Sequence, residues 1–138
     1  MNSQRRNHAQ DRASTKQKLS FSGLTANQED KYHWVEIPIG KGIYHFVLYL
    51  DNSEPIKLKL AHAEDKTNNQ SDKCSSHLRK LSKYGEPVLF VLCGQGWRSL
   101  RLKKYLPDFK EIIGDNYVIH TSDLTEWVKS QINELESR

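Results

Sequence analysis

Basic side chains at regular spacing are the first sign of chemistry in this chain. Arg98, Arg101 and Lys104 recur every three residues. Residues three apart share one face of a helix, so the three cations would form a patch that contacts phosphate oxygens. The same spacing also fits an ordinary solvated helix face, and both interpretations stay open.

Glycine, cysteine and histidine residues offer less. Gly94-Gln-Gly-Trp97 follows an apolar run and would let backbone amides approach a phosphate, but the third glycine of a dinucleotide-binding motif is absent. A tight turn packed by Trp97 is therefore favoured. Cys74 and Cys93 do not have zinc-type spacing and predict free thiols. The histidines are spread over several elements, so the sequence predicts no metal centre.

The charge of the chain is unevenly divided. The net charge is +4 and the pI is near 9.0, which favours an anionic partner. Residues 1–30 hold five basic and three acidic side chains and have sparse hydrophobic residues, so half of the excess lies there. We expect residues 1–30 to form a disordered basic arm, either solvated or lying along phosphates. Residues 31–138 are expected to form a single domain.

Two further features concern location. The N-terminus is polar and lacks the apolar region of a secretory signal. No run approaches the roughly 20 consecutive apolar residues that cross a bilayer. The sequence thus predicts a cytoplasmic, intracellular protein that does not enter the membrane.

The elements that position these residues begin near Tyr32. Residues 34–39 and 56–61 alternate between apolar and polar side chains, and residues 43–50 form an apolar run rich in strand-forming types. Gly40-Lys-Gly42 and the 51–55 cluster predict tight turns between these strands. Three strands joined by such short turns predict an antiparallel meander.

The second half of the domain alternates helices and strands. A helix is expected around residues 75–84, a strand buried on both faces at 87–93, and a partly helical stretch at 98–105. A strand at 117–120 and a final amphipathic helix follow. The predicted fold class is α/β, with α+β character. A mixed central sheet starts with the antiparallel meander and continues as α-β-(α)-β-α.

This order resembles the core of the PD-(D/E)XK nuclease fold, the restriction-endonuclease-like fold, over roughly residues 34–120. The Pro87–Trp97 segment and the Tyr117–Leu124 segment are also similar to the late strands of some type II restriction enzymes. The resemblance implies an acidic residue on the second strand and an Asp/Glu-x-Lys triplet on the third. Two carboxylates would hold Mg²⁺, and the lysine would stabilise the developing charge.

Two registers place that pattern on this chain. In the first, His45 stands for the acid and Lys57-Leu58-Lys59 for the triplet, with both lysines on the wet face of their strand. Imidazole and ammonium groups are poor ligands for a hard cation, so this register implies an eroded site. In the second, Asp51 is the acid and Glu64-Asp65-Lys66 the triplet, but Asp65 would then replace a core aliphatic residue. The first register is favoured.

The sequence therefore favours a nucleic-acid-binding protein of restriction-endonuclease-like fold with an eroded or atypical nuclease site. DNA is the expected partner, and the expected contacts are His45, Lys57, Lys59, Arg98, Arg101 and Lys104. One alternative is an active Mg²⁺-dependent endonuclease that uses Asp51, Glu64 and Lys66. Such nucleases often act as homodimers, but the sequence indicates no dimer surface. Another alternative is a non-enzymatic subunit or inhibitor that contacts a protein partner, for which the final helix is the expected surface. Only the active endonuclease needs a cofactor.

Overall fold

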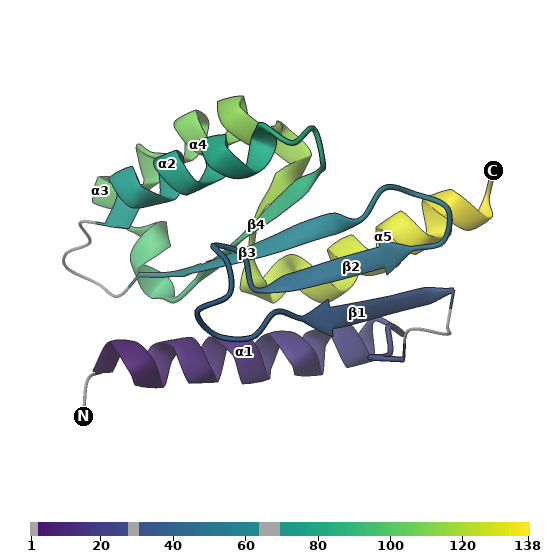
Figure 1. Cartoon of the computed structure of the whole chain (residues 1–138). Helices are drawn as coiled ribbons and strands as arrows, with labels where there is room; N and C mark the ends of the chain where they lie inside the picture. The colour runs from purple at the N-terminus through teal and green to yellow at the C-terminus, as the bar shows by residue number, and fades with distance from the viewer. Residues whose placement is uncertain (1–2, 28–30, 64–69) are drawn as a thin grey trace.

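The fold is a five-stranded mixed sheet with helices on both faces (Figure 1). The computed structural model describes residues 3–27, 31–63 and 70–138. The strands lie in the order of the chain, with β1, β2 and β3 antiparallel and β3, β4 and β5 parallel. This confirms the predicted mixed α/β sheet and its antiparallel meander. The strands are β1 (Tyr32–Glu36), β2 (Phe46–Leu50), β3 (Ile56–His62), β4 (Val88–Cys93) and β5 (Val118–His120).

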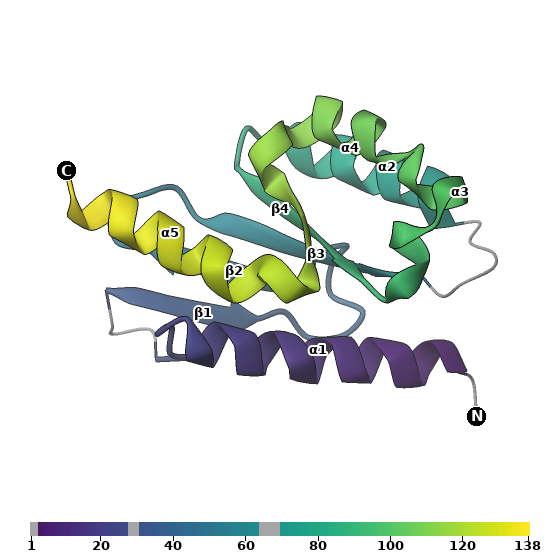
Figure 2. The same cartoon turned by 180° about the vertical axis from the view of Figure 1, so that it is seen from behind.

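The helices form one layer on each face of the sheet (Figure 2). Helices α1 (Ser3–Phe21) and α5 (Leu124–Glu136) contact each other on one face. The other face carries α2 (Gln70–Ser82), α3 (Leu100–Lys103) and α4 (Leu106–Ile113). Within the described ranges, no helix is long and apolar enough to cross a membrane.

Strand β4 explains why two separate cores form. Its residues alternate between the faces: Leu89 and Val91 join the core under α1 and α5, while Phe90 and Leu92 join the core under α2 and α4. All six β4 residues are buried, as the continuous apolar run predicts. Burial on both faces fixes the register of this strand, because a shift by one residue would exchange the two sets of side chains.

Helix α1 corrects the expectation of a disordered arm. Ser3–Phe21 is helical, and Leu19 is fully buried in the core beneath α5. The rest of the helix is held largely by polar contacts, such as the hydrogen bond of 3.1 Å that the Thr125 hydroxyl donates to the Lys18 carbonyl. Polar anchors leave no apolar periodicity, so the sequence of this segment looks like that of a solvated tail.

Two details of the meander also differ from expectation. The β1–β2 connection is a loop over residues 37–45, longer than predicted, because β2 begins only at Phe46. The loop does contain a tight turn, in which the Lys41 amide donates to the Pro38 carbonyl at 3.1 Å and Gly40 has a φ of 83°. Lys57 and Lys59 share one face of β3, as predicted, but that face is covered rather than wet. Lys59 is 9% exposed, because the core beneath α2 extends over this part of the strand.

Candidate functional site

One edge of the sheet gathers imidazole groups from separate elements. The parallel strands β3 and β5 end there with His62 and His120, and His45 immediately precedes β2, which begins at the same edge. We call this side the carboxyl edge; it faces the N-terminal half of α1, at the left of Figure 1. Ligands of open α/β sheets commonly bind outside the carboxyl ends of parallel strands.

Asp11 and His62 join α1 to the end of β3. The Nδ1 atom of His62 lies 3.0 and 3.2 Å from the two carboxylate oxygens of Asp11. Burial raises the pKa of Asp11, and the charge and hydrogen bond of His62 act against that rise. A carboxylate only accepts hydrogen bonds, so Nδ1 carries the ring proton that faces it. The pair orients the imidazole and holds α1 over the carboxyl edge.

His45 is a neutral hydrogen-bond donor at this edge. Its Nδ1 accepts a hydrogen bond of 3.0 Å from the backbone amide of Leu60. Burial, with smaller contributions from the charges of Lys59 and Arg12, lowers the pKa of His45 to about 3. The single ring proton at neutral pH therefore lies on Nε2, which becomes the donor of the ring.

A pocket of about 470 Å³ opens between α1 and the β1–β2 loop. We call it the cleft pocket; its lining residues are His8, Ala9, Arg12, Ile39, Gly40, Gly42 and His45. Arg12 is held in place by Nη1, which donates to the Glu36 carboxylate at 2.7 Å and to the Ile37 carbonyl at 3.0 Å. None of these seven residues carries a carboxylate, so the walls combine small apolar groups with hydrogen-bond donors.

Glu36 positions Arg12, and its removal is expected to weaken the docking of α1. Lys16 lies 2.6 Å from the second Glu36 oxygen. Burial would raise the pKa of Glu36, but hydrogen bonds from Lys16 and Arg12 and their charges hold it below its usual value. We expect Glu36→Gln to lose about 1–2 kcal/mol in urea unfolding at pH 7, because two charge-assisted contacts weaken together. Glu134→Gln, which removes an exposed pair with Arg138, should change stability by less than about 0.5 kcal/mol; equal losses would contradict this role for Glu36.

The surroundings of Lys57 and Lys59 indicate that both side chains have a structural role. The Lys57 ammonium lies 3.1 Å from the Glu86 carboxylate and about 5 Å from the ring centres of Tyr44 and Tyr84. Burial lowers the pKa of Lys59, and a smaller opposing effect comes from Cys74. Neither lysine lines the cleft pocket.

The basic triplet of the second half does not form one helix face. Arg98 ends the short 3-10 turn η1 (Gln95–Arg98), Arg101 lies in the four-residue helix α3, and Lys104 follows that helix. Arg98 and Lys104 are exposed, whereas the Arg101 side chain lies outside the described residues. Arg98 lies near the carboxyl edge, because η1 follows directly after the end of β4. Burial lowers the pKa of His120, and the Arg98 charge lowers it further.

Asp51 lies at the opposite edge of the sheet. It occupies the β2–β3 turn with a φ of 52° and pairs with Lys31 at 3.6 Å. The length of β3, about 20 Å at 3.3 Å per residue, separates this turn from the carboxyl edge. Glu64 and Lys66, the other members of the alternative triplet, lie outside the described residues. The described residues contain no group of three or more His, Cys, Asp or Glu side chains placed to hold a metal ion.

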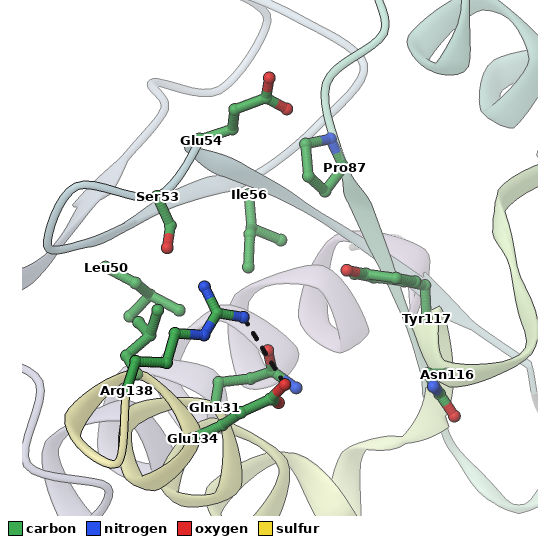
Figure 3. Close-up of a pocket in the computed structure, with 11 residues that line it drawn as sticks. Leu50, Ser53, Glu54, Ile56, Pro87, Asn116, Tyr117, Gln131, Glu134 and Arg138 are labelled. Carbon is green, nitrogen blue, oxygen red and sulfur yellow. Dashed lines mark ion pairs between the residues drawn. The ribbon is translucent and has the colours of Figure 1, made fainter.

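A second pocket, of about 430 Å³, lies at the edge that carries Asp51 (Figure 3). Glu54, Glu134 and Arg138 contribute its charged groups, and the Arg138 guanidinium lies 3.7 Å from the Glu134 carboxylate. Two carboxylates against one guanidinium make this pocket less suited to an anionic ligand than the cleft pocket.

The α1 residues of the site could not be found from the sequence. His8, Asp11 and Arg12 lie in the segment expected to be disordered, and His62 is one of several histidines spread along the chain. A comparison with known proteins does not supply the missing assignment. No family model and no curated protein matches this chain. The interpretation of the site therefore depends on its geometry.

Proposed function

We propose that this protein binds nucleic acid at the carboxyl edge of its sheet. The observation that carries the proposal is the cleft pocket, where Arg12, His8 and His45 present hydrogen-bond donors and, among the described residues, no carboxylate lines the walls. Hydrogen-bond donors and cations at the carboxyl ends of strands suit phosphate and base oxygens.

We further propose that the fold is restriction-endonuclease-like and that its nuclease site is eroded or atypical. Support comes from the strand order, in which an antiparallel meander leads through α2 into parallel strands. His45, which the favoured register puts in the place of the acid, lies at the carboxyl edge immediately before β2 rather than on it. The neighbouring carboxylate, Asp11, comes from α1 and pairs with His62. Imidazoles are poor partners for Mg²⁺, which prefers oxygen ligands.

Salt-dependent binding tests this proposal. Fluorescence anisotropy with labelled duplex and single-stranded DNA should show an affinity that falls at least tenfold between 50 and 200 mM salt. The reason is that the basic side chains of the bound protein displace counterions from the phosphates. Arg98→Gln, at the carboxyl edge, should weaken binding a further three- to tenfold and lower the salt slope by about one. Lys83→Gln, which changes an exposed lysine after α2 at the other edge, should leave affinity unchanged. Absent binding at 50 mM salt, or binding insensitive to salt, would contradict the proposal.

A further inference from the structure

We infer that the cleft pocket takes one unpaired nucleobase, so that the preferred ligand is a single strand. The inference deepens the proposed function and rests on it. It depends on three features of the pocket: its size, its apolar walls and the identity of its donors.

The size and walls of the pocket suit a flat ring. A volume of about 470 Å³ lies within the range of roughly 300–1,000 Å³ that is typical of small-molecule sites. Ala9, Gly40 and Gly42 have little or no side chain, which leaves room between α1 and the loop. Ile39 is 83% exposed, so a large apolar side chain stands in water beside the opening. A stacked base would cover part of this apolar surface.

The donors of the pocket favour a neutral ring over a phosphate group. Arg12 lines the pocket but is already paired with Glu36 at 2.7 Å, so its charge is largely balanced. His45 is uncharged and offers Nε2–H, because Leu60 occupies Nδ1. Base edges carry carbonyl and ring-nitrogen acceptors for such a donor, and arginine and histidine side chains stack on bases.

A duplex would not present a base in this way. Its bases are stacked on one another and their pairing edges are occupied, so entry would require a base to be extruded at a cost of a few kcal/mol. In a single strand the bases are accessible and the phosphates remain outside the pocket, near the basic side chains of α1 such as Lys16. The pocket thus predicts a preference for single strands beyond the phosphate attraction common to both.

Three labelled ligands of equal length separate base binding from phosphate binding. A ten-nucleotide single strand should bind about tenfold more tightly than an abasic strand of the same charge, and more tightly than the blunt duplex. If the abasic strand binds as well as the strand with bases, the nucleobase inference is wrong while the proposed phosphate binding survives. If none of the three ligands binds, the proposed function itself fails.

Two charge-matched variants on α1 locate the base. Ala9 lines the cleft pocket, and Ala13, one helical turn further along, does not; both are exposed, so glutamate at either position should leave the fold intact, as circular dichroism will check. The new carboxylate has a basic partner three residues on in each case, Arg12 or Lys16. We expect Ala9→Glu to abolish the tenfold preference for bases and Ala13→Glu to retain it. A base preference that survives Ala9→Glu would place the base elsewhere and overturn the inference.

Discussion

Lowering the pH from 7 to 4 is expected to remove about 3 kcal/mol of folding free energy through His45 alone. Its pKa is about 3 in the folded protein and 6.5 when unperturbed. Below about pH 6.5 the unfolded chain therefore binds a proton at His45 that the folded chain does not bind. The sign follows: His45 leaves stability undiminished above pH 6.5 and costs progressively more as the pH falls toward 3.

The surroundings of His45 explain why the folded state refuses the proton. Protonation would place the second ring proton on Nδ1, the atom that accepts a hydrogen bond from the Leu60 amide nitrogen at 3.0 Å. The ring is also desolvated, and the charges of Lys59, Arg12, His8 and His77 all disfavour the imidazolium. Loss of this acceptor would separate β3 from the start of β2 at the carboxyl edge.

Urea unfolding of the wild type and His45→Asn at pH 7, 5.5 and 4 measures the effect. The asparagine carbonyl can accept from the Leu60 amide but does not titrate, so the variant should be close to wild type at pH 7 and lose about 3 kcal/mol less by pH 4. Contributions from Glu36 and Asp11 are common to both proteins and cancel in the difference. His33→Asn, which changes a histidine of β1 stacked on Tyr49, should retain the wild-type loss. Parallel pH profiles for the wild type and His45→Asn would refute this account.

The sheet could be predicted from the sequence because its signals are local. Alternating residues in β3 indicate a strand, and the continuous apolar run of β4 indicates a strand that is buried on both faces. Short connections between the first three strands then predict an antiparallel order. The coverage of Lys59 could not be predicted in the same way, because it depends on the path of α2 over the sheet rather than on any pattern within β3.

Most of the candidate site could not be predicted from the sequence, because its contacts are polar and join residues that are far apart along the chain. Asp11 meets His62 across 51 residues, and Arg12 meets Glu36 across 24. Neither pair leaves a periodic signal in α1, where a charged helix and a solvated tail have the same composition. His45, His62 and His120 come together only through the order and direction of three strands, so their spacing in the chain carries no information about the edge they share.

The second large effect is expected at Trp97, where Trp97→Ala should lose about 3–5 kcal/mol. The indole is fully buried and lies in edge-to-face contact with Phe90 at 6.3 Å and Phe109 at 5.9 Å between ring centres. Its Nε1–H donates a hydrogen bond of 2.9 Å to the carbonyl of Ala61 in β3. Removing the ring therefore leaves a cavity beneath α4 and an unmet contact at β3.

Thermal and urea unfolding of three variants apportion this loss. Trp97→Phe keeps most of the ring packing but removes the donor to Ala61, so it should lose about 1–2 kcal/mol. Trp127→Ala, at a partly buried indole whose Nε1–H donates to the Asn116 carbonyl at 2.8 Å, should lose less than Trp97→Ala. Similar losses at Trp97 and Trp127 would mean that Trp97 does not carry the core beneath α4. The expected order instead follows from position: Trp97 joins the turn after β4 to the end of β3, so its removal loosens both strands at the edge where His62 and His45 lie.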